Sequence, residues 1–147
     1  MHRAAQIVDA IDGLIRARVS AAGVKVFKHT RTRLDYEQDE LPAISIDYGE
    51  DSPDVGATLN ELASVLTVEF NAVAQAPIEA ELHDTLMELR AEIHVALMAN
   101  FNLGLQFVEW TQYGPVDAPD INQEGETITG SLKSRWLIHY SMGSDPN

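Results

Sequence analysis

The sequence predicts an α+β fold in which one antiparallel or mixed sheet of about five strands carries two helices on one face. Two segments place apolar residues at spacings of three and four, which is typical of amphipathic helices. In five other segments, apolar residues alternate with polar ones or form short runs, which is typical of strands. The expected order is α-β-β-β-α-β-β. Strands that follow one another without a crossover helix are expected to pair antiparallel.

The two expected helices have recognisable ends. The first stops before Gly23, because a glycine just past the last turn commonly terminates a helix. The second begins at Pro77, whose fixed backbone angle suits a first turn, and ends near Asn100. Their apolar stripes are Ala4, Ile7, Val8, Ile11, Leu14 and Ile15 in the first helix, and Ile78, Leu82, Leu86, Leu89, Ile93 and Leu97 in the second.

The expected strands cover residues 24–28, 41–48, 62–74, 105–113 and 127–140. The polar stretches between them, residues 30–40, 49–60 and 114–125, are expected to be loops. Helices and sheet should enclose one core. Its expected members are Ile7, Ile11, Leu14, Ile44, Ile46, Val68, Phe70, Leu82, Leu86, Leu89, Ile93 and Trp136.

Length and composition favour one soluble domain over residues 1–147, with a polar tail at 141–147. The sequence contains no cysteine, which excludes disulfides and thiolate chemistry and fits a reducing compartment. Asp9 and Asp12 interrupt the apolar residues near the start, so we expect no signal peptide there. Apolar runs stay well short of the roughly 20 residues that span a membrane.

Charge is unevenly distributed along the chain. The formal net charge is −13, which argues against binding to a nucleic-acid backbone. Residues 1–33 nevertheless hold seven Lys and Arg against two Asp, whereas the remaining 114 residues hold three cations and 21 acids. One interpretation is a solvated acidic surface with a basic start. The other is a two-faced subunit whose basic patch meets an acidic patch on a neighbouring copy, and such heterologous contacts close rings.

The second interpretation predicts a particular subunit or partner interface. Its expected cations are Arg16, Arg18, Lys25, Lys28, Arg31 and Arg33. Its expected acids are Glu50, Asp51 and Asp54 in a loop, and Asp84, Glu88 and Glu92 along one side of the second helix. Because exposed ion pairs are screened by salt, an assembly built on them should weaken as ionic strength rises.

The sequence contains no pattern typical of a catalytic, metal or cofactor site. The five histidines do not show the two-histidine, one-turn spacing of a helical zinc site. Glu79 and His83 are four residues apart and are expected to form a surface pair. The loop carboxylates have no burial that would shift their pKa values, and the glycines form no phosphate-binding loop. Trp110, Tyr113 and Trp136, together with Tyr140, are expected to be core or interface anchors.

The segment Glu40-Leu41-Pro42-Ala43-Ile44-Ser45-Ile46, followed by Gly49-Glu50-Asp51-Ser52-Pro53, resembles the tail terminator and tail-completion proteins of long-tailed bacteriophages, including lambda-type minor tail protein U. In that family a similar strand entry precedes a short acidic loop. The order of elements agrees with the family over the whole length of the chain. The motif itself is short and moderately specific.

The resemblance implies a structural, non-enzymatic virion protein without cofactors. A ring of six copies would sit at the head-proximal end of the tail after assembly in the host cytoplasm. It would contact the tail tube protein and the head-completion or connector protein, end tube polymerisation and join tail to head. The resemblance implies no membrane contact and no direct reading of nucleic acid.

Other functions remain open at this stage. A different head–tail connector, a neck protein or a tail-tube-like protein would share these sequence features. A free-standing cytoplasmic binding domain or a small enzyme would instead be a monomer or dimer with converging polar groups in a pocket. The sequence does not fix the subunit number or which face would meet the tube.

Overall fold

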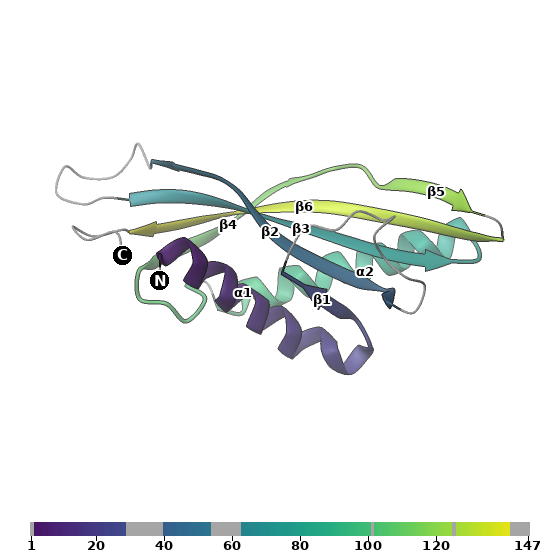
Figure 1. The fold of residues 1–147 in the computed structure, drawn as a ribbon, viewed down its shortest axis with the longest axis horizontal. Coiled ribbons are helices and arrows are strands. Elements are labelled where there is room, and N and C mark those ends of the chain that lie inside the picture. Colours follow the sequence, from purple (N-terminus) through teal and green to yellow (C-terminus); the bar gives the residue numbers. More distant parts are fainter. Residues whose placement is uncertain (1, 29–39, 54–62, 101, 125, 142–147) are drawn as a thin grey trace.

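The computed structural model describes residues 2–28, 40–53, 63–100, 102–124 and 126–141. They form two helices and a six-stranded mixed sheet, so the α+β prediction is confirmed. Both helices lie on one face of the sheet, as expected (Figure 1). The strands run in the order β1-β2-β3-β6-β4, and β5 also pairs with β6.

Helix α1 (Arg3–Val19) begins where the sequence predicts. The ring nitrogen Nδ1 of His2 accepts a hydrogen bond from the backbone N–H of Ala4 at 3.0 Å, which satisfies one of the unpaired donors of the first turn. The helix tightens into a 3-10 turn, η1 (Ser20–Ala22). Gly23 then reverses the chain with a φ of 82°, a value that favours glycine.

Strand β1 (Lys25–Phe27) pairs parallel with β2 (Ala43–Pro53), with Val26 opposite Ile44. The prediction that strands without an intervening helix pair antiparallel is therefore wrong for this pair. A parallel return needs a crossover of about a dozen residues or more, helical or not. Residues 28–42 supply that length.

Strand β2 continues beyond its expected end. Residues 49–53 were expected to begin a loop, but they extend the strand past a register shift between Tyr48 and Asp51. The segment carries no apolar alternation, and its Asp51 accepts hydrogen bonds from the polar groups of Ser64 and Tyr140. Backbone pairing with β3 (Ala63–Ala76) holds it, from Asp51 opposite Leu66 to Pro53 opposite Ser64.

The centre of the sheet is the antiparallel pair of β3 and β6 (Thr127–Ser141), which is continuous from Ala63 opposite Ser141 to Ala76 opposite Ile128. Strand β4 (Val108–Val116) covers one half of β6, and β5 (Asp120–Glu124) covers the other. β5 was expected to be loop. Only one of its five residues, Ile121, is apolar, so no period marked it. It forms because β6 is longer than β4.

Helix α2 (Glu79–Met98) follows β3 and packs on β3, β6 and α1. Its expected face is buried from Leu82 onward, with Leu82, Leu86 and Leu89 at most 4% exposed. Ile78, which was expected to belong to this face, precedes the helix and is 52% exposed. Leu82 and Leu86 lie against Gly130 of β6, where a Cβ would lie 2.9 Å from Leu82 Cδ2. A side chain at this position would therefore collide with the helix.

The predicted core is confirmed with one difference. Eleven of its twelve members are buried, including Trp136 at 1% exposure, whereas Leu14 is only partly buried against the core. On β3 the alternation of Leu66, Val68 and Phe70 with polar residues places the apolar set under the helices. We call the opposite side, which carries Thr67 and Glu69 of β3 and their neighbours, the outer face of the sheet.

Candidate functional site

Among the described residues, the expected interface cations Arg16, Arg18 and Lys28 form ion pairs within the chain. The Arg16 side chain reaches Asp12 one turn away at 2.9 Å, and the Arg18 guanidinium lies 2.5 Å from Glu92 of α2. The Lys28 ammonium pairs with Asp9, and this hydrogen bond raises the pKa of Lys28. These partners are more than two-fifths exposed, apart from Asp12 at 15%. Such pairs contribute at most about 1 kcal/mol each.

The expected acids are dispersed rather than gathered. Glu50 and Asp51 lie on β2, whereas Asp84 and Glu88 are exposed on α2. Among the described residues, Glu92 is the expected interface acid that pairs with an expected interface cation, Arg18. Arg31, Arg33 and Asp54 belong to the predicted interface but lie outside the described residues.

Asp51 has a role that the sequence did not suggest. Its Oδ2 accepts a hydrogen bond from the Tyr140 hydroxyl at 2.7 Å, and its Oδ1 accepts one from the Ser64 hydroxyl at 2.8 Å. The Tyr140 ring is fully buried. Burial, reinforced by the carboxylate, raises the pKa of Tyr140 from its usual 10.0 to about 12. The cluster ties the ends of three strands together.

This cluster predicts a pH-dependent loss of stability. Because the pKa of Tyr140 is higher in the folded chain, the folded state holds the phenolic proton more tightly than the unfolded state. Its contribution is complete below about pH 10 and is lost as the pH rises toward about 12. Tyr140→Phe should be less stable than the parent at pH 8, and urea titrations at pH 8 and pH 11 should show the gap shrinking. A gap that widens at pH 11 would contradict this account.

The sequence did not distinguish the exposed aromatic residues of β4 from the buried aromatic residues of β6. Trp136 and Tyr140 belong to the core, whereas Trp110 and Tyr113 are 44% and 41% exposed. The Trp110 indole stacks on the His139 ring on the outer face, with ring centroids 4.4 Å apart. Alternation along β4 places Trp110 and Thr111 on opposite faces of the sheet. It does not show which of the two faces is exposed to solvent.

Tyr113 lies on the helix side of β4, beside the exposed flank of α2. Its hydroxyl is hydrogen bonded by Arg90, and the Arg90 guanidinium carbon lies 5.6 Å from the Tyr113 ring centroid. His94 contacts the same ring edge-on at 5.4 Å. An arginine and two ring systems on one partly exposed surface are side chains typical of protein interfaces.

Arg135 organises the polar side chains of the outer face. It pairs with Glu69 of β3 at 3.2 Å and with Asp117, just after β4, at 2.9 Å. The hydrogen bond from Arg135 lowers the pKa of Asp117. This arrangement fixes the turn between β4 and β5 against the sheet.

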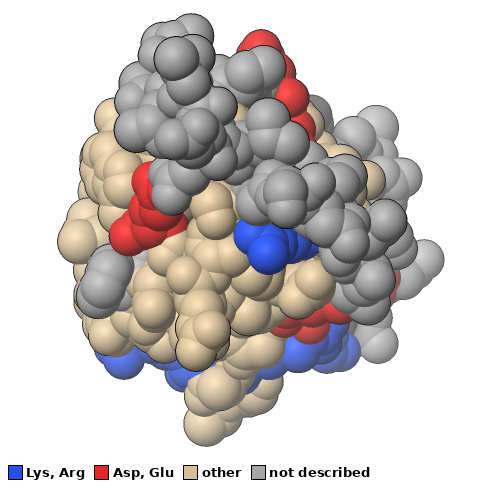
Figure 2. Space-filling model, turned by 90° about the vertical axis from the view of Figure 1, so that its left-hand side faces the viewer, with Lys and Arg blue, Asp and Glu red and all other residues tan. Residues whose placement is uncertain are grey.

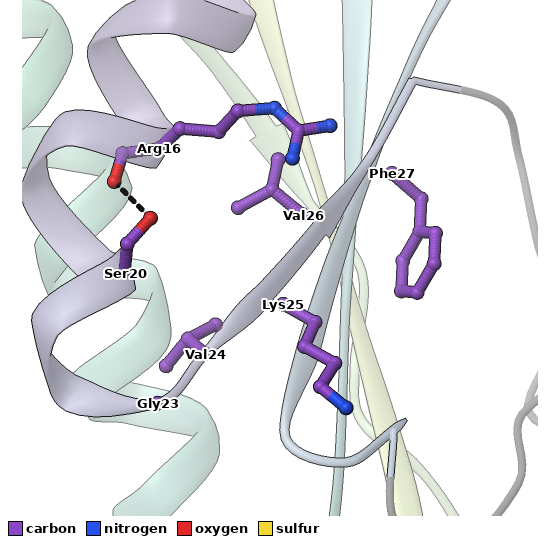
Figure 3. Close-up of a pocket in the computed structure, with 7 residues that line it drawn as sticks. All are labelled: Arg16, Ser20, Gly23, Val24, Lys25, Val26 and Phe27. Carbon is purple, nitrogen blue, oxygen red and sulfur yellow. Dashed lines mark hydrogen bonds between the residues drawn. The ribbon is translucent and has the colours of Figure 1, made fainter.

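The part of the chain that the structure describes carries several open clefts. One cleft of about 460 Å³ lies where α1 ends and β1 begins, lined by Arg16, Val24, Lys25 and Phe27 among others (Figure 3). Another, between Ala5 and Val8 of α1 and Tyr48 of β2, also measures about 460 Å³. In Figure 2 the Lys and Arg side chains of one end of the molecule form separate groups, with carboxylates beside some of them.

Glu79 and His83 form the expected surface pair, with 3.5 Å between Oε1 and Nε2. Within the described ranges, no three His, Asp or Glu side chains are placed to hold a metal ion. Neither described helix is both long and apolar enough to cross a bilayer.

Comparison with known proteins gives a structural likeness without a sequence likeness. The chain matches no protein-family model and no curated protein sequence. Among solved structures, it resembles a chain of the virion of a native gene transfer agent (GTA) particle, with a TM-score of 0.51 and 10% identity. The alignment covers 90% of this chain and 93% of that chain. At this identity, the likeness shows that the two chains share a fold.

Proposed function

We propose that this protein is a structural component of a phage-type virion, where it forms a ring that ends the tail tube and joins tail to head. The observation that carries the proposal is the near-complete structural alignment with a virion chain of a gene transfer agent particle. That particle chain is matched almost end to end, so the two chains resemble each other as whole subunits rather than through one common motif.

The surface supports an assembly role over a chemical one. The clefts are open, and the ionisable side chains that line the described ones, such as Asp9 with Lys28 and Arg18 with Glu92, are paired with each other. Two exposed aromatic side chains, Trp110 and Tyr113, lie on the edge strand β4. A capping protein needs two binding faces and a ring contact, and these features suit contacts of that kind.

Reconstitution with the tail-tube protein of the same genome tests this function. We expect the purified protein to assemble into a ring on one end of the tube and to stop its elongation, seen by negative-stain microscopy and sedimentation. Self-polymerisation into tubes would indicate a tail-tube protein instead. Binding to the head portal without effect on the tube would indicate a connector. A monomer or dimer that leaves tube growth unchanged would overturn the proposal.

A further inference from the structure

One side of α2 carries apolar and aromatic side chains that the core does not use. Met87, Ala91, His94 and Met98 follow one another at spacings of four, three and four residues, and all four are exposed. On a helix this spacing lines residues up along one side, which here points away from the buried leucines of α2. We refer to these four residues as the exposed stripe of α2.

Strand β4 widens the exposed stripe near its middle. Tyr113 is 41% exposed, and its ring contacts His94 edge-on. Both rings also contact the buried indole of Trp136, with ring centroids 5.3 Å away for Tyr113 and 5.4 Å away for His94. Side chains that are held in this way lose little conformational freedom when a partner binds, so this part of the surface is already ordered for binding.

Exposed apolar side chains gather at this surface. The described part of the chain has seven large apolar side chains that are exposed, and Met87, Val95, Met98 and Tyr113 are four of them. An apolar patch that is contiguous and rimmed by polar residues is typical of an interaction site, whereas single exposed apolar residues are ordinary. Methionine adapts its shape to the groups that it meets, which suits a docking surface.

The exposed stripe lies between opposite charges. Asp84 and Glu88 are one turn apart on the side nearer α1, where Glu88 lines a cleft together with Arg18. Neither acid has an ion-pair partner among the described residues. Arg90 lies on the other side and hydrogen bonds the hydroxyl of Tyr113. In the same described ranges, no carboxylate pairs with Arg90.

We propose that the exposed stripe docks an amphipathic helix of another virion protein, one whose apolar side is bordered by a row of Lys or Arg. Spacings of three and four let apolar residues of two helices pack along a common seam. Asp84 and Glu88 meet the cations of the partner helix, and Arg90 meets a carboxylate on its other side. The inference rests on the proposed function and names a surface that joins the subunit to a neighbour in the particle.

The charges favour a different protein over a second copy of this chain. An antiparallel pair of α2 helices brings the same side of both helices together, so the unpaired acids of one copy approach those of the other. A parallel pair sets Asp84 against Asp84 of the other copy. The other described helix, α1, offers no matching surface, because its apolar residues are buried and Arg16 and Arg18 already pair within the chain.

A set of synthetic peptides tests the chemistry of this surface on the purified protein. The probe is a helix of Leu and Lys in which the leucines recur at spacings of three and four. One control has the same composition in shuffled order, and the other replaces every Lys with Glu. Fluorescence anisotropy should show that the Leu and Lys helix binds roughly tenfold or more tightly than either control.

Variants of the protein separate the exposed stripe from the general acidity of the surface. Met87→Ala/Met98→Ala should weaken binding of the Leu and Lys helix roughly tenfold or more, because it truncates two half-exposed side chains of the stripe. Asp84→Asn/Glu88→Gln should weaken it several-fold. Circular dichroism melting curves identify any variant that fails to fold.

Two controls lie on β2. Tyr48→Ser removes an exposed aromatic side chain that does not belong to the stripe. Glu50→Lys changes the net charge by the same amount as Asp84→Asn/Glu88→Gln, but at an acid of a different element. Both should leave binding of the Leu and Lys helix within about twofold of the parent.

Cross-linking in assembled particles identifies the occupant. A photoreactive phenylalanine analogue in place of Met87 or Met98 should link to a segment of another virion protein. Mass spectrometry should read in that segment the apolar repeat with a row of Lys or Arg beside it. The same analogue in place of Tyr48 should not link to that segment.

The possible failures separate. Links from the stripe to a second copy of this chain, or to a segment without the apolar repeat, would overturn the docking proposal. Binding of the Leu and Lys helix that ignores Met87→Ala/Met98→Ala would also overturn it, because attraction to an acidic surface would then suffice. These outcomes leave the ring function standing. A protein that binds the probe as expected but forms no ring on tubes would overturn the ring function and leave the docking surface in place.

Discussion

Leu86→Ala should destabilise the protein by about 2–5 kcal/mol, because the side chain lies in a region of the core that cannot easily collapse. Leu86 is 1% exposed on α2 and lies against β6 at Gly130. Truncation removes its apolar contacts and leaves a cavity between helix and sheet. Urea unfolding followed by circular dichroism should show a lower midpoint with an unchanged slope.

The neighbouring residue gives a matched control. Met87 is on the same helix but 51% exposed. Met87→Ala should change the free energy of unfolding by only about 0.5 kcal/mol. Equal losses for the two variants would show that α2 does not pack through the face described above.

Gly130→Val should cost about 1–3 kcal/mol through overpacking. A Cβ at this position would lie 2.9 Å from Leu82 Cδ2 and 3.3 Å from Leu86 Cδ1, and both leucines are buried. The helix would have to move away from the sheet or the leucines would have to leave their rotamers. The change in the free energy of unfolding again measures the effect.

A double-mutant cycle identifies the cause of that loss. Leu82→Ala removes the nearest of the methyl groups that the valine would meet. The two substitutions together should therefore be less destabilising than the sum of the single variants, by about 0.5–3 kcal/mol. Strict additivity would place the effect of Gly130→Val in the strand itself rather than in the contact with α2.

The elements that the sequence predicted correctly are those with a strong local period. The buried faces of α1, α2 and β3 follow from the spacing of their apolar residues, and Gly23 ends the first helix as expected. The limits of these elements differ from the expected ones by a few residues. Burial in a two-layer fold imposes such periods, so they can be recognised without a structure.

Elements held by long-range pairing escaped prediction. β5 has one apolar residue, and it exists because β6 leaves room beside β4. β1 pairs parallel with β2 across a connection whose path no local pattern describes. The extension of β2 pairs with β3, and its Asp51 accepts a hydrogen bond from Tyr140, 89 positions away in sequence. Each of these features depends on a partner that is distant in the chain.

For the candidate site, likewise, the distribution of charge along the sequence could not predict which residues pair. The excess of cations at the start of the sequence is real, but composition does not say which acids face them. The structure pairs Arg18 with Glu92 inside the subunit and places the acid-only stretch 108–127 at the opposite sheet edge. The exposure of Tyr113 similarly depends on where α2 ends its coverage of the sheet, whereas Trp110 lies on the outer face.

Tail length in assembled particles tests the central claim most directly. Particles produced with and without this gene should be compared by electron microscopy, with the gene supplied in trans as a control. Without the protein, we expect tails of uncontrolled length that do not join heads, and restoration of joined tails of uniform length when the gene is supplied. Tails of normal length attached to heads in its absence would contradict the proposed function.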